Sequence, residues 1–199
     1  MFLVGSAFAQ DAPIIRKGVT EVGGFVGASY GGVTAVDRTR VMGGGNIVYS
    51  LTRVLMPFAE FSYFPGIPRE GVPVPGTNRI SQNFSSPIDD FNFGFHVRIP
   101  IPKSRIIPYG VISFGGIHSP AKTITASYPN PFPPPAQPPI VTTPVDVPGV
   151  TDFAVSGGAG IRYYATERMG FRAEFKAYKP HGTLSDSFYR VTGGFFFQF

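Results

Sequence analysis

Three histidines are the side chains of this chain best suited to chemistry at neutral pH, because acyl transfer needs an imidazole held beside a hydroxyl and a carboxylate. His118 is followed directly by Ser119. If the segment is a strand, however, neighbouring residues point to opposite faces. His96 falls on the polar side of its segment, and His181 belongs to a serine- and aspartate-containing segment at 181–187 that we expect to be a loop. We therefore predict no catalytic residues.

Cofactor and metal chemistry have equally little support. The chain has no cysteine, which excludes a thiolate metal site, a disulfide framework and a cysteine nucleophile. Two glycine stretches, "GGG" at 43–45 and "GGAG" at 157–160, do not open helices, so they do not read as phosphate-binding loops. Glycines at such places instead permit curvature or close side-chain packing. We predict no cofactor and no metal site.

The charged residues are few and dispersed. They make up 15% of the chain, and 17 Lys and Arg against 12 Asp and Glu give a formal net charge of +5. The basic residues stand singly or in pairs and form no basic run, so we expect no nucleic-acid partner. With 25 Gly, 21 Pro, 20 Phe and 9 Tyr, the composition favours an all-β protein over a helical or disordered one.

The elements that position these side chains follow a period of two. Within 169–178, Met169, Phe171 and Phe175 share one parity while Arg172 and Glu174 share the other. Such alternation is the signature of a strand with one apolar face. The segments 90–101 and 189–199 alternate in the same way, and weaker patterns occupy 21–31, 41–51, 55–64, 106–117 and 152–165. The 106–117 segment is apolar on both parities, which leaves its orientation open. Eight strands of about ten residues suit a tilted crossing of a bilayer.

The connections alternate between short and long. Short turns are predicted at "TRV", "PKSR" and "TER", and long links at 32–40, 65–87, 118–151 and 179–186. An up-and-down antiparallel barrel in the outer membrane has short periplasmic turns and long extracellular loops. No run of apolar residues reaches the length of a transmembrane helix. We therefore predict an all-β, eight-stranded antiparallel up-and-down transmembrane β-barrel.

The direction in which the charges point separates a membrane barrel from a soluble one. A soluble, lipocalin-like binder would turn its phenylalanines inward and its charges to water. Here glycines share the side of the strands that carries the charges, and small residues fit a crowded interior. The phenylalanines on the other side fit contact with hydrocarbon. We therefore predict that the polar parity lines the barrel as a lumen network of Glu60, Asp90, Asn92, His96, Arg98, Arg162, Arg172, Glu174, Lys176 and Arg190.

With its last strand included, the chain resembles the eight-stranded OmpA- and OmpX-like barrels of the outer-membrane β-barrel family. The resemblance covers nearly all of the chain and is most specific in Tyr189, Val191, Phe195, Phe197 and Phe199, which look like the family's assembly signal. It implies localisation in the cell outer membrane, contact with membrane lipid and lipopolysaccharide, and recognition by the barrel-assembly machinery. Because the printed sequence ends at this signal, we expect no peptidoglycan-binding domain of the kind found in full-length OmpA-type proteins.

The first residues, "MFLVGSAFAQDAP", contain the small-x-small pattern that signal peptidase cleaves, with Ala7 and Ala9 at the required positions. The apolar run before them is short, and no positively charged region precedes it. We therefore expect 1–9 to be the remnant of a truncated signal peptide, 10–20 a short N-terminal segment and 21–199 the barrel.

Function is less constrained than fold, because small barrels act as anchors, adhesins, enzymes and pores. A lumen of eight strands is filled by side chains, so we predict a structural or surface-interaction role for a monomer acting through its extracellular loops. Proline in 118–151 favours extended polyproline II geometry, which suits either a surface partner or a stiff loop with no partner. The alternatives are a narrow pore that leans toward anions, a lipid-modifying barrel enzyme and a soluble lipocalin-like binder.

Overall fold

The structure is a computed structural model that describes residues 16–31, 40–73, 81–129, 140–182 and 187–199. Ala7, Ala9 and the whole of 1–9 lie outside these ranges, so the signal-peptide assignment stays a prediction. No helix in the described part of the chain is long and apolar enough to cross a membrane.

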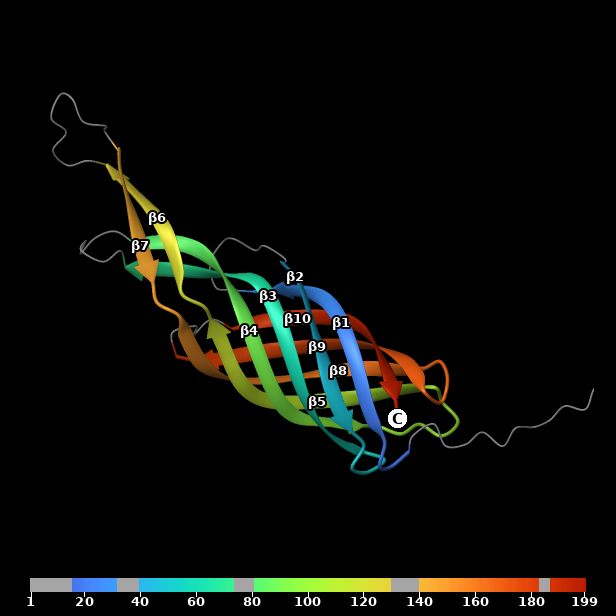
Figure 1. The fold of residues 1–199 in the computed structure, drawn as a ribbon. Coiled ribbons are helices and arrows are strands. Elements are labelled where there is room, and N and C mark those ends of the chain that lie inside the picture. Colours follow the sequence, from blue (N-terminus) through green and yellow to red (C-terminus); the bar gives the residue numbers. More distant parts are fainter. Residues whose placement is uncertain (1–15, 32–39, 74–80, 130–139, 183–186) are drawn as a thin grey trace, which may run out of the picture.

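Eight antiparallel strands form a closed barrel in the order β1-β10-β9-β8-β5-β4-β3-β2, so consecutive barrel strands are neighbours and β1 closes on β10 (Figure 1). Full closure leaves the barrel without an unpaired edge. The predicted eight-stranded up-and-down barrel is confirmed. Its strands are β1 (Thr20–Tyr30), β2 (Arg40–Tyr49), β3 (Leu55–Pro73), β4 (Ser81–Arg98), β5 (Ile106–Ser119), β8 (Val150–Tyr164), β9 (Met169–His181) and β10 (Phe188–Gln198).

Two of the predicted long links contain strand. β3 and β4 continue through most of 65–87 and stay paired as far as Pro73 opposite Ser81. Within 118–151, β6 (Lys122–Pro129) pairs with β7 (Ile140–Val147) as a separate two-stranded hairpin. The expected polyproline II geometry is therefore wrong for 140–147, whereas the proline-dense part of that stretch, 130–139, lies outside the described residues. Proline is tolerated in β6 and β7 because both strands of a two-stranded sheet are edges.

The two ends of the barrel differ (Figure 1). We call the end with the connections 50–54, 99–105 and 165–168 the turn end; the C-terminus lies there as well. The other end, from which β3 and β4 extend and the β6–β7 hairpin projects, we call the hairpin end. β4 stops at Arg98, so Ile99 and Ile101, predicted to be strand residues, belong to a turn-end connection.

The outer surface of the barrel is an apolar belt. On β8 the exposed side chains run from Phe153 to Tyr163, about 33 Å along the strand at roughly 3.3 Å per residue and about 25 Å along the axis at a tilt near 40°. Other exposed members include Val26, Ile47, Phe61, Phe91, Phe93, Phe95, Ile112, Phe114, Phe171, Phe175 and Phe195. A monomeric soluble protein does not expose so continuous an apolar surface. The lipocalin-like alternative, which needs these aromatics inside, is therefore wrong.

The interior of the barrel is layered. An apolar cluster at the hairpin end contains Phe64, Ile88, Ile117 and Phe188, among others. Smaller clusters lie toward the turn end, one around Met56 and Tyr109 and one of Ile107, Tyr164 and Phe196. The ionic side chains occupy the space between. The layering explains why 106–117 looks apolar on both parities: Ile107 and Ile117 face the apolar ends of the lumen, while Ile106 and Phe114 face outward.

Inward glycines make room for inward aromatic rings. A Cβ atom on Gly160 would lie 2.5 Å from the Tyr109 ring, and one on Gly44 would lie 2.6 Å from the Phe25 ring. In both cases the glycine sits on a strand adjacent to the strand of the ring. Close packing is therefore one role of the two glycine stretches.

Candidate functional site

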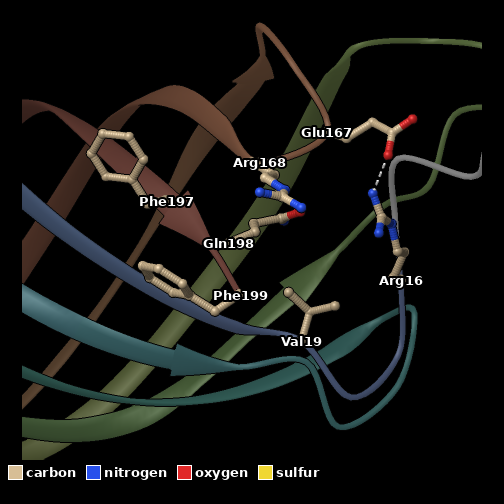
Figure 2. A pocket seen from close by; sticks show the side chains of 7 residues that line it. All are labelled: Arg16, Val19, Glu167, Arg168, Phe197, Gln198 and Phe199. Atoms are coloured by element: carbon tan, nitrogen blue, oxygen red, sulfur yellow. Dashed lines mark hydrogen bonds and ion pairs between the residues drawn. The ribbon is translucent and has the colours of Figure 1, made fainter.

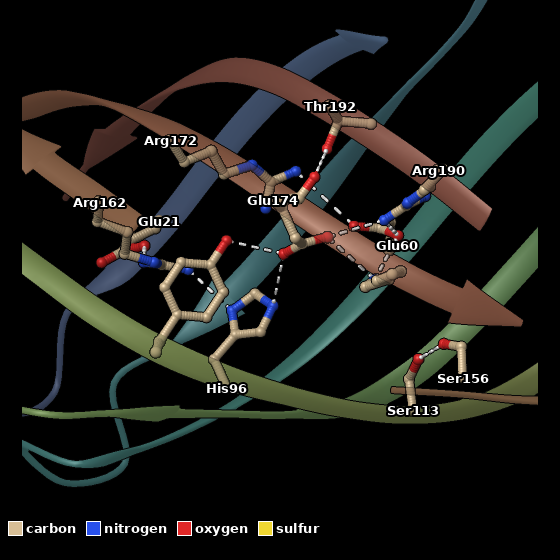
Figure 3. Close-up of polar contacts among 12 residues, drawn as sticks. Glu21, Glu60, His96, Ser113, Ser156, Arg162, Arg172, Glu174, Arg190 and Thr192 are labelled. Carbon is tan, nitrogen blue, oxygen red and sulfur yellow. Dashed lines mark hydrogen bonds and ion pairs between the residues drawn. The ribbon is translucent and has the colours of Figure 1, made fainter. Parts of the chain in front are cut away.

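The centre of the lumen is a buried ionic cluster that joins β3, β9 and β10 (Figure 3). Lys176 Nζ donates to Glu60 Oε1 at 2.8 Å, and Arg190 donates to the same oxygen. Arg190 Nη2 also donates to Glu174 Oε1 at 3.0 Å, and Lys176 Nζ lies 3.4 Å from that atom. These four side chains have no solvent exposure. Two carboxylates and two cations therefore neutralise one another in the interior.

A second ionic cluster lies nearer the turn end and is centred on Glu21. Arg162 Nη1 donates to Glu21 Oε2, Gln198 Nε2 donates to Glu21 Oε1 at 2.9 Å, and Arg98 Nη1 lies 3.9 Å from Oε1. Glu21 is a carboxylate that sequence reasoning missed. The only sequence signal for its position is that Glu21 alternates in step with Gly23, Phe25 and Gly27. Because Phe25 is apolar, this side of the strand does not stand out as the polar one.

Tyr109 and His96 connect the two clusters. Tyr109 Oη donates to Glu174 Oε2 at 2.8 Å. Arg162 Nη2 donates to His96 Nδ1 at 2.8 Å, while His96 Nε2 lies 3.6 Å from Glu174 Oε2. The imidazole is fully buried and stacks on Phe58 with ring centroids 4.3 Å apart. His96 is thus held inside the barrel, away from lipid and from water.

The remaining predicted lumen residues are buried but less well paired. Arg172 Nη2 lies 3.7 Å from Glu60 Oε2, the guanidinium makes no hydrogen bond to the described residues, and it sits 4.9 Å from the centre of the Phe25 ring. Asn92 Nδ2 donates to Asp90 Oδ2 at 2.6 Å. The structure thus places all ten predicted side chains in the interior, but in separate groups.

The network is capped by apolar side chains at the hairpin end, whereas at the turn end it reaches the 50–54 connection, where Arg98 donates to Ser50 Oγ and Thr52 O. The apolar cluster around Phe64 and Phe188 lies on the hairpin side of the ionic cluster, and Ile107, Tyr164 and Phe196 pack together on the turn side. Dispersion contacts between such side chains leave little room for water. The arrangement can hold the strands together, and among the described residues the apolar cluster at the hairpin end interrupts the polar path along the axis.

Among the described residues, the other two histidines are not assembled into a nucleophilic site. His118 Nδ1 lies 2.9 Å from Thr151 Oγ1, whereas the Ser119 hydroxyl points to the opposite face and bonds Ser86 at 2.7 Å. His181 ends β9, with its ring 6.3 Å from that of Phe153. Ser185 and Asp186 lie outside the described residues. In the described ranges, no three His, Asp or Glu side chains converge as metal ligands would.

The residues of the expected assembly signal line the outside of β10. Tyr189, Val191, Phe195, Phe197 and Phe199 are all exposed. The Tyr189 ring stacks on Tyr30 across the closing seam and on Phe175 of β9, with centroids 5.6 and 5.9 Å apart. This placement is compatible with contact by another molecule from the membrane, and the assembly role itself stays a prediction.

Known proteins share the fold of this chain rather than its sequence. No family model and no curated protein sequence matches it. Among solved structures, it is similar to Neisserial surface protein A, NspA, with a TM-score of 0.61 and 9% identity over 92% of this chain and all of the other. It is also similar to Ail, the attachment invasion locus protein of Yersinia pestis, crystallised with the heparin analogue sucrose octasulfate, with a TM-score of 0.56, 9% identity and the same coverage. These matches establish the fold alone, that of small outer-membrane barrels.

Proposed function

We propose that this chain, which has the fold of the eight-stranded OmpA- and OmpX-like outer-membrane barrels, is an integral outer-membrane protein that works as a surface-interaction platform. One observation carries the proposal: the interior is filled, whereas strand structure continues past the apolar belt at the hairpin end. β3 has 19 residues and β4 has 18, against 10 in β2. The β6–β7 hairpin adds about 26 Å of further reach at roughly 3.3 Å per residue.

The chemistry of the hairpin end favours a protein partner of mixed charge. Ail was crystallised with a sulfated sugar, which would favour a basic surface. The charged side chains described at this end balance one another: Arg40, Lys122 and Lys179 against Asp89, Asp146 and Asp152. A balanced surface does not attract a polyanion over a long range. The unpaired edges of β6 and β7 instead offer backbone groups to an extended peptide.

The experiment compares cells that display the full chain with cells that display a variant in which 122–147 is replaced by a short Gly-Ser turn. Adhesion to surfaces coated with extracellular-matrix proteins should fall several-fold in the variant. The amount of folded barrel in each strain is measured by the shift of its gel band on heating. Equal adhesion at equal amounts of folded barrel would refute the role of the hairpin.

A pore that leans toward anions is the alternative raised by the five interior cations. The apolar cluster on the hairpin side of the network opposes it. In planar bilayers, the purified barrel should produce no channel openings in chloride solutions. Regular single-channel steps would favour the pore over a purely structural interior.

A further inference from the structure

The turn end of the barrel is strongly basic. Among the described residues outside the lumen, six Lys and Arg residues lie there, against one acidic residue, Glu167. The cations are Arg16, Lys17, Arg53, Lys103, Arg105 and Arg168. Six positive charges minus one negative charge leave an excess of +5 on the described surface of this end. The excess positive charge is therefore concentrated where the apolar belt meets water.

A cleft of about 420 Å³ opens beside these cations at the seam between the first and last strands (Figure 2). One wall is apolar and consists of Val19, Phe197 and Phe199. The two phenylalanines are 43% and 80% exposed and belong to the belt that faces hydrocarbon. The cleft therefore begins in the acyl-chain region of the membrane.

The other wall of the cleft is polar. Arg16 Nη2 is engaged by Glu167 Oε2 at 2.6 Å. The Arg168 guanidinium is exposed and makes no hydrogen bond or ion pair with any described residue, and Figure 2 shows it between Glu167 and Gln198. One cation of the cleft is thus neutralised and the other is available to an anion.

We propose that this cleft binds an anionic glycerophospholipid of the adjacent leaflet, with the lipid phosphate on Arg168 and the acyl chains along Phe197 and Phe199. An apolar wall next to an unpaired guanidinium matches a lipid at the level of its headgroup. The surrounding cations favour an anionic headgroup over a zwitterionic one. Because short turns of such barrels face the periplasm, the ligand belongs to the inner leaflet. The inference rests on the membrane assignment and is independent of the adhesive role of the hairpin.

The test is native mass spectrometry of the full chain in detergent, with equimolar phosphatidylglycerol and phosphatidylcholine of identical acyl chains. The wild type should retain phosphatidylglycerol preferentially. Arg168→Gln should reduce the preference about fivefold, the factor expected for one basic residue at an anionic lipid surface. Arg53→Gln removes an equal charge from a turn outside the cleft and should change the preference less than twofold.

A second variant tests the site without removing Arg168. Glu167→Gln releases Arg16 from its ion pair, so the preference for phosphatidylglycerol should rise by about twofold or more. This result remains decisive if Arg168→Gln does not fold, which the heat shift of its gel band reveals. Equal retention of both lipids by the wild type, equal losses in Arg168→Gln and Arg53→Gln, or no gain in Glu167→Gln would overturn the proposal. None of these outcomes would affect the adhesion experiment.

Discussion

Replacement of Glu60 by glutamine is the sharpest test of the ionic interior. The change keeps the shape of the side chain and removes its charge. Glu60 accepts hydrogen bonds from Lys176 and Arg190 and lies 3.7 Å from Arg172, and all these side chains are buried. Removing one member of a buried ion pair costs about 3–5 kcal/mol, because a charge is left unpaired. We expect the free energy of unfolding to fall by about that amount.

The measurement is equilibrium urea unfolding in phospholipid vesicles, followed by the heat-shifted gel band. Glu167→Gln is the matched control, since it makes the same chemical change in a pair whose side chains are 40% and 58% exposed; it should cost less than about 1 kcal/mol. Adding Lys176→Met to Glu60→Gln should recover part of the loss, because it removes one of the stranded cations. A loss for Glu60→Gln no larger than that for Glu167→Gln would refute the reasoning.

Three further predictions concern packing, lipid exposure and the projecting hairpin. Gly160→Ala should destabilise the barrel by about 1–3 kcal/mol because its new Cβ would overlap the Tyr109 ring, while Gly110→Ala, with open space around it, should stay within about 0.5 kcal/mol in the same urea assay. Phe93→Arg puts a charge on the lipid face and should cost about 2–4 kcal/mol, whereas Phe93→Leu should cost much less; equal losses would argue against lipid contact at this position. Deleting 122–147 should leave the urea midpoint nearly unchanged, because β6 and β7 pair only with each other; a large drop would mean that the hairpin supports the barrel.

Alternation with a period of two predicts correctly which side chains face outward, because every outward position contacts lipid and therefore favours an apolar side chain. Phe91, Phe93 and Phe95 repeat without interruption and lie outward on β4. The same rule fails in 65–87 and 118–151, where proline and glycine normally mark loops. There the ladder between paired strands overrides local preference, as the pairing of Pro73 with Ser81 shows. A strand that is stabilised mainly by backbone pairing with its neighbour does not need alternating apolar residues, so its own sequence predicts it poorly.

The interior is only partly predictable from sequence. Parity identifies which side chains point inward, but it does not identify which of them meet. Parity places Asp90 in the lumen network, but its carboxylate accepts a hydrogen bond from Asn92, whereas the cation Arg162 donates to Glu21. Glu21 and Arg162 lie on strands far apart in the chain, and their contact depends on the stagger that closes the barrel. Local patterns carry no information about that stagger.

The separation between charge partners constrains how the protein enters its membrane. Glu60 and Arg190 are 130 positions apart, and Glu21 and Arg162 are 141 apart. A hairpin that crossed the bilayer alone would carry Glu60 into hydrocarbon without its counter-ions, at a cost of several kcal/mol. Crossing of the early and late strands together avoids this cost, which favours a concerted insertion over one that proceeds hairpin by hairpin.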